Sequence, residues 1–81
     1  MKHIWSERIK FQMWGLPQGN YTVKKYYSKL QECNMSIGYP EDVLKMLFLV
    51  GLSPENKTKV LMDGLQVLRL DEIVERLSPE Q

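Results

Sequence analysis

Glycine and proline divide this chain into short segments, and this division limits the fold more than any other feature. The breaks fall at residues 15–20, at Gly38 and Pro40, at Gly51 and Pro54, and at Gly64. Proline stops a helix because it lacks an N–H group, and glycine readily takes the left-handed conformation that ends one. Apolar residues between the breaks recur every three or four positions, and no alternating run predicts a strand. The 81 residues therefore predict an all-α fold, a small bundle of four short helices preceded by an additional N-terminal helix.

The first two helices are expected on either side of the glycine-rich connection at residues 15–20. A helix over residues 2–14 carries apolar residues at four-residue spacing, namely Trp5, Ile9 and Met13. We divide the chain into an N-terminal helix with its linker, residues 1–15, and a helical domain, residues 16–81. Thr22 is the predicted N-cap of the next helix, which precedes a loop over residues 34–39. The inner face of that helix is expected to carry Val23, Tyr26, Tyr27, Leu30 and Cys33.

Proline followed by acidic residues marks the start of the third helix. Pro40 is expected at its first position, with Glu41 and Asp42 stabilised by the helix dipole. The helix is predicted over residues 40–50, and Gly51 is expected to end it in the left-handed conformation.

Similar signals predict the last two helices. Ser53 is the expected N-cap of a helix over residues 54–63, which Gly64 ends. Asp71 is the expected cap of the final helix, with Leu70 just before it. The residues expected to point inward from these helices are Val60, Leu61, Ile73, Val74 and Leu77.

Residues that support catalysis or metal binding are scarce. His3 is the single histidine and Cys33 the single cysteine, so neither an intramolecular disulfide nor a four-ligand zinc site can form. The acid pairs at 41–42 and 71–72 fall at helix starts, where the helix dipole accounts for them. No nucleotide-binding or metalloprotease motif occurs. We expect no enzyme, no catalytic residue, no metal and no cofactor.

Sequence features also favour a cytoplasmic protein. The longest unbroken apolar run, residues 46–50, is far shorter than the about 20 residues that cross a bilayer. The single cysteine is typical of a reducing compartment. We expect no membrane partner and no small-molecule substrate.

Charge is unevenly distributed, although the net charge is only +1. Residues 1–31 hold six bases and one acid, whereas residues 32–81 hold five bases and nine acids. Lys24, Lys25 and Lys29 lie on the outer side of the second helix, where they are either solvated or contact phosphates. A small helical nucleic-acid-binding module is therefore one alternative function, although the near-neutral total excludes strong nonspecific binding.

The predicted third helix is apolar on too many sides. Seven of the eight residues at positions 43–50 are apolar, whereas a surface helix usually shows a single apolar stripe. One face carries Leu44, Leu47, Phe48 and Gly51, and a nearly opposite face carries Tyr39, Val43, Met46 and Val50. Either this helix is surrounded by the other four, or its second face is a self-association interface.

The order of motifs extends over residues 16–77. Gln18-Gly19 is followed by Thr22, Tyr26, Tyr27 and Leu30, then by an apolar helix, by Gly51-Leu52-Ser53-Pro54-Glu55, and by Leu70-Asp71-Glu72-Ile73. This order resembles the C-terminal capsid domain of Gag polyproteins from retroviruses and long-terminal-repeat retrotransposons. The Gln-Gly before an aromatic helix is similar to the major homology region of that family. Thr22 stands where retroviral sequences carry an acid, and the zinc knuckle and the protease motif are missing.

The resemblance implies a viral structural protein or a domesticated relative that dimerises to support capsid assembly. Its partner would be itself, as a homodimer that can build a higher assembly, in the cytoplasm or within a capsid-like particle. The family's dimer helix maps onto residues 40–50, which implies a dimer interface of Tyr39, Val43, Met46 and Val50. Gln18, Gly19, Thr22 and Tyr26 would define the fold rather than bind a ligand. A Gag-derived adaptor that binds a partner peptide is a further alternative.

Overall fold

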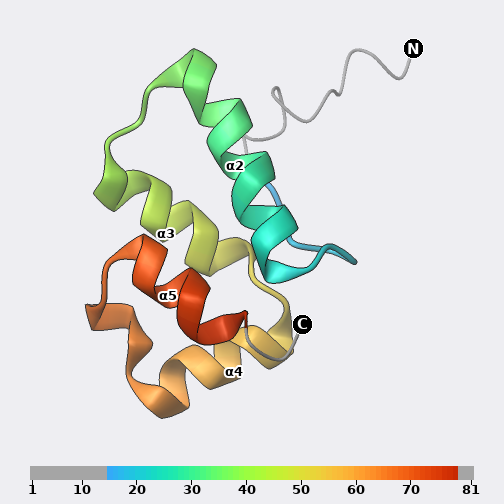
Figure 1. The fold of residues 1–81 in the computed structure, drawn as a ribbon, viewed down its shortest axis with the longest axis vertical. Helices are drawn as coiled ribbons and strands as arrows, with labels where there is room; N and C mark the ends of the chain where they lie inside the picture. Colours follow the sequence, from blue (N-terminus) through green and yellow to red (C-terminus); the bar gives the residue numbers. More distant parts are fainter. Residues whose placement is uncertain (1–14, 79–81) are drawn as a thin grey trace.

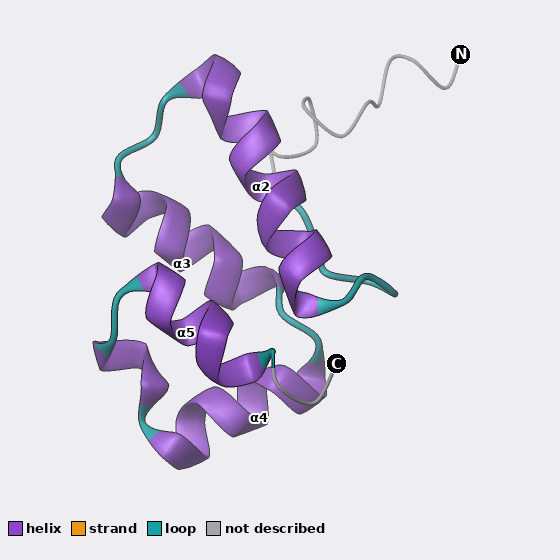
Figure 2. Cartoon of the chain, in the orientation of Figure 1, coloured by secondary structure: helices purple, strands orange, loops and turns teal. Residues whose placement is uncertain are grey.

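The computed structural model describes residues 15–78, and in that range the chain is all α, with four α-helices and no strand. The helices are α2 (Val23–Ile37), α3 (Glu41–Gly51), α4 (Pro54–Asp63) and α5 (Leu70–Leu77). A 3₁₀ turn, η2 (Leu65–Val67), joins the last two (Figure 1; Figure 2). The predicted all-α bundle is confirmed. The helix predicted over residues 2–14 lies outside the described residues.

The four helices surround one core as two pairs, α2 with α3 and α4 with α5. α2 and α3 lie closest where α2 begins and α3 ends, the connection at residues 38–40 spans their wider end, and α4 crosses below them (Figure 1). α5 packs against both α2 and α4, so the last helix closes the core. None of the described helices is long and apolar enough to cross a membrane.

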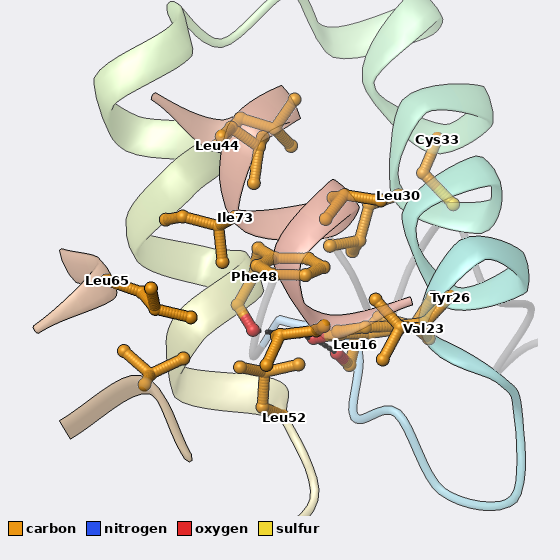
Figure 3. Close-up of a cluster of buried hydrophobic side chains, with 14 residues drawn as sticks. Leu16, Val23, Tyr26, Leu30, Cys33, Leu44, Phe48, Leu52, Leu65 and Ile73 are labelled. Carbon is orange, nitrogen blue, oxygen red and sulfur yellow. Dashed lines mark hydrogen bonds between the residues drawn. The ribbon is translucent and has the colours of Figure 1, made fainter. Parts of the chain in front are cut away.

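Aromatic stacking joins α2 to α3 at the centre of the core (Figure 3). The rings of Tyr26 and Phe48 are stacked with centroids 5.3 Å apart, and Tyr27 meets Phe48 edge-on at 6.2 Å. Tyr27 was expected inside but is only partly buried. The fully buried large side chains, from all of the α-helices except α4, are Tyr26, Phe48, Leu30, Leu70, Ile73, Leu77 and Val23.

Several predicted helix ends are confirmed because local hydrogen bonds determine them. The Thr22 side chain accepts a hydrogen bond from the Lys25 N–H at 3.2 Å, and Ser53 accepts one from the Asn56 N–H at 3.3 Å. Gly64 ends α4 in the left-handed conformation with φ of 63°. N-caps such as Thr22 and Ser53 each contribute about 1 kcal/mol to helix stability.

The loop predicted over residues 34–39 is wrong in its first part. α2 continues to Ile37 and ends at Gly38, whose φ is 80°. Asn34 remains helical because its side chain holds the Tyr39 backbone. The side-chain oxygen accepts from the Tyr39 N–H at 2.8 Å, and the side-chain NH₂ donates to the Tyr39 carbonyl at 3.1 Å. Pro40 occupies the cap position of α3 rather than its first turn.

The start of α5 also differs from the prediction. Arg69, not Asp71, is the N-cap residue, and its N–H donates to the Glu72 carboxylate at 3.2 Å. Leu70 is the first residue of the helix and is 2% exposed. Because Leu70 is buried in the core as part of the helix, α5 begins before Asp71. Ile73, Val74 and Leu77 are buried as predicted.

Candidate functional site

Gln18 fastens the segment before α2, residues 15–20 and here called the strap, to the corner between α3 and α4. Its side chain is 4% exposed. The Oε1 atom accepts hydrogen bonds from the Ser53 N–H at 2.9 Å and the Asn56 side chain at 3.2 Å. The Nε2 group donates to the Tyr21 carbonyl at 2.8 Å, and the Gln18 N–H donates to the Gly51 carbonyl at 2.7 Å. Both ends of the amide are used, as burial of a polar group requires.

Tyr26 holds the other end of the strap from within the core. Its hydroxyl donates to the Leu16 carbonyl at 2.6 Å and lies 3.3 Å from the Phe48 carbonyl oxygen (Figure 3). Burial raises the pKa of the Tyr26 phenol well above its ordinary value. The neutral hydroxyl is therefore the form that stabilises the fold.

Gly51 does not end α3 in the left-handed conformation that the sequence suggested. It is the last residue of the helix, and its φ is not positive. A methyl group at this position would overlap the Tyr26 hydroxyl and the Leu16 carbonyl oxygen. A glycine is needed here because the strap passes directly against the helix backbone.

Gly19 and Thr22 shape the turn that leads from the strap into α2. Gly19 has a φ of 57°, and a Cβ there would meet nothing within 4 Å, so its backbone conformation accounts for the glycine. Thr22 caps α2 at the position where retroviral sequences carry an acid. The four residues predicted to define the fold thus lie along one continuous segment, from the strap into α2.

The side of α3 that faces away from the core carries three of the four predicted interface residues, and we call Val43, Met46 and Val50 the outer face. Met46 is 56% exposed and Val50 is 65% exposed. Val43 is half-buried. Leu44 and Phe48, on the opposite side, are buried in the core. Among the described residues α3 is therefore not surrounded on all sides. The helix predicted over residues 2–14, which the first of the two interpretations includes, lies outside the described residues.

Tyr39 lies in the turn before α3 and is less exposed than Met46 and Val50. Its ring packs against the core cluster, and Asn34 holds its backbone. It therefore borders the outer face instead of standing at its centre.

A pocket of about 220 Å³ lies between the end of α3 and α4, next to the outer face. Its lining residues are Leu49, Leu52, Lys57, Val60, Leu61 and Gln66. Leu61 was expected to point inward but is 70% exposed, whereas Val60 is buried as predicted. Leu49 also borders a shallower hollow with Met46 and Val50, so the pocket and the outer face are continuous. The spacing of the apolar residues at 46, 49 and 50 was the available sequence signal for this surface.

The predicted nucleic-acid residues lie on the first half of α2. Lys24 and Lys25 are exposed, while the Lys29 ammonium lies 5.4 Å from the centroid of the Tyr21 ring. That distance is typical of a cation–π contact, so Lys29 also packs within its own chain.

Groups capable of catalysis are few in the described part of the chain. Cys33 is a buried cysteine on α2, and His3 lies outside the described residues. Between residues 15 and 78 no group of three or more histidine, cysteine or acidic residues is placed to hold a metal. The acids at helix starts serve the backbone: Asp42 accepts from the Val43 N–H at 2.9 Å and Asp71 from the Glu72 N–H at 3.0 Å.

Comparison with known proteins found no family model, no curated protein and no solved structure that matches this chain. The functional assignment therefore depends on the outer face of α3 and on the order of the motifs.

Proposed function

We propose that this chain is a non-enzymatic self-association module that pairs with a second copy through the outer face of α3. The observation that carries the proposal is the exposure of Met46 and Val50, one helical turn apart, on a helix whose opposite side lies in the core. Removing apolar surface from water contributes about 25 cal/mol per Å². A contiguous exposed apolar surface of this kind is typical of a protein interface.

The motif order supports a more specific proposal, a Gag-like capsid C-terminal domain whose dimer contributes to capsid assembly. Gln18 of the Gln-Gly motif and the aromatic residue Tyr26 have the same structural role. The hydrogen bonds of both residues hold the strap against α3. The helix that this motif supports is the same helix that carries the outer face. The cytoplasm or the interior of a capsid-like particle is the corresponding location.

The proposed contact is a two-fold pairing of α3 with α3 of the second copy. In such an isologous interface both copies use the same surface patch. Met46, between Val43 and Val50 on this patch, would then lie close to the symmetry axis. A standard interface buries about 800 Å² per partner. A face on one short helix is smaller than this, and we expect a dimer of weak to moderate affinity.

Substitution of Met46 tests the proposal. We expect Met46→Asp to remain folded by circular dichroism and to be a monomer by light scattering at concentrations where the unchanged chain is a dimer. Burying a carboxylate without a partner on each side of the axis would oppose pairing.

Met62→Asp is the matched control, because Met62 is 80% exposed on α4 and lines neither the pocket nor the neighbouring hollow. This variant should dimerise like the unchanged chain. A Met46→Asp chain that still dimerises would contradict the interface, and one that unfolds would place Met46 in the core.

A further inference from the structure

We infer that the second copy packs with its α3 antiparallel to α3 of the first, so that the partner's Asp42 pairs with Lys57 beside the α3–α4 pocket. The inference deepens the proposed function and rests on it. Three observations support it: the continuity of the pocket with the outer face, the opposite charges at the two ends of this surface, and the area that a stable dimer needs.

The pocket and the outer face belong to one continuous strip along α3. The residues that line the shallow hollow on this helix are Asp42, Lys45, Met46, Leu49 and Val50. Leu49 also lines the α3–α4 pocket, together with residues of α4. Asp42 and Leu49 are about two helical turns apart, so they lie on the same flank of the helix. The strip therefore runs from the first turn of α3 to the pocket beside its last turn.

The two ends of this strip carry opposite charges. Asp42 is exposed in the first turn of α3, where its Oδ1 atom accepts a hydrogen bond from the Val43 N–H at 2.9 Å. An ionised carboxylate can accept several more hydrogen bonds. Lys57 is exposed on α4 and lines the pocket at the other end. Lys45 borders the middle of the strip, where its long side chain can reach solvent.

Charge distinguishes the two ways in which a two-fold axis can pair this helix. In a parallel pair both acids lie at one end of the interface and both lysines at the other. An axis near Met46 and at right angles to α3 exchanges the ends of the helices but keeps the flank. The partner's Asp42 then lies about 6 Å beyond Met46, at the level of Val50 and beside the pocket. Opposite charges meet at both ends, and such complementarity sets the orientation of an interface.

Antiparallel packing also enlarges the contact. The outer face belongs to one short helix, whereas a standard interface buries about 800 Å² per partner. The first turn of the partner's α3 covers the pocket of about 220 Å³, whose lining is mostly apolar and includes Leu61, which is 70% exposed. Covering this lining removes further apolar surface from water, which is the main favourable contribution to association.

Charge reversal tests the orientation. Lys57→Glu or Asp42→Lys alone places like charges together at both ends of the pair. We expect each to raise the dimer dissociation constant about tenfold, measured by light scattering over a concentration series. The double variant Asp42→Lys, Lys57→Glu restores opposite charges and should dimerise nearly like the unchanged chain. The loss in each single variant should shrink at about 1 M salt, because screening weakens exposed charge pairs.

Lys24→Glu and Glu32→Lys are the matched controls, because they make the same charge changes at exposed positions of α2. Both should leave the dissociation constant unchanged. Asp42 also stabilises the start of α3 through the helix dipole, so circular dichroism is measured for every variant. Asp42→Asn removes the charge without reversing it and should recover part of the affinity that Lys57→Glu loses.

Single reversals that leave the dissociation constant unchanged would overturn the inference, as would a double variant that binds no more tightly than the single ones. Either result would leave the proposed dimer intact, with its helices in another orientation. An unchanged chain that is a monomer at every concentration would instead overturn the proposed function, and the orientation with it.

Discussion

The hydroxyl group of Tyr26 occupies the space that the missing side chain of Gly51 leaves free. It reaches from α2 to the end of α3 and donates to the Leu16 carbonyl at 2.6 Å. The strap can lie against α3 because the two residues are matched, one with a long polar side chain and one with none.

We expect Gly51→Ala to destabilise the fold by about 1–3 kcal/mol, as overpacking of a closely packed site does. The measurement is the free energy of unfolding in urea. Part of the cost should disappear in a Tyr26→Phe background, giving a coupling of at least about 0.5 kcal/mol. Gly38→Ala serves as the control for the coupling: its φ of 80° makes alanine unfavourable, but a Cβ there would meet nothing within 4 Å, so the cost should be the same in the Tyr26→Phe background. The absence of coupling between Gly51 and Tyr26 would contradict the packing described above.

Tyr26 should make the protein sensitive to alkaline pH. Burial raises the pKa of the phenol in the folded state, whereas the unfolded phenol keeps a pKa of about 10. Its contribution is complete below about pH 10 and is lost as the pH rises through and beyond that value. We expect Tyr26→Phe to be less stable at neutral pH, by about 1–2 kcal/mol, and to lose less stability between neutral and alkaline pH. Equal alkaline slopes for both chains, measured by urea unfolding, would argue against this role.

Gln18→Glu should be destabilising although the shape of the side chain is kept. The introduced carboxylate could still accept from Ser53 and Asn56, but it would have no N–H for the Tyr21 carbonyl. We expect a loss of about 1–3 kcal/mol, as for a buried acceptor left without its donor. Gln31→Glu, at an exposed position on α2, should change the unfolding free energy far less. Similar losses at both positions would show that the amide donor of Gln18 is unimportant.

The lysines of α2 give a prediction about nucleic acid. Lys24 and Lys25 are exposed, but Lys29 contacts Tyr21 and the net charge is only +1. We expect no measurable binding of single-stranded RNA or duplex DNA at about 50 mM salt by fluorescence anisotropy. Binding that weakens steeply with salt and is lost in a Lys24→Glu, Lys25→Glu chain would support the alternative function instead.

Local signals predicted the helix boundaries that depend on neighbouring residues. Thr22, Ser53 and Gly64 act within one turn of their own position, so their roles can be inferred without knowledge of the rest of the fold. Boundaries that depend on contacts beyond one helical turn were wrong. Leu70 enters α5 because the core buries it, and Asn34 stays helical because Tyr39 returns to it.

The candidate site likewise has features that the local sequence predicted and features that depend on contacts far apart in the chain. The apolar pattern of residues 43–50 was sufficient to predict two faces on α3, and the structure places Met46 and Val50 at the surface. The same pattern could not reveal that Gly51 makes room for Tyr26, since Tyr26 and the strap both lie far from Gly51 in sequence. Leu61 was misplaced because an apolar residue beside a buried valine is equally consistent with a core and with the wall of a pocket.

The Gln18 side chain joins residues that are 35 and 38 positions away along the chain, in a domain built mostly from contacts within and between neighbouring helices. Contacts of such long separation form late in folding, because the intervening chain must be ordered first. Interactions absent from the folding transition state act mainly on the rate of unfolding. We therefore expect the strap contacts to slow unfolding, so that Gln18→Glu raises the unfolding rate and leaves the folding rate almost unchanged.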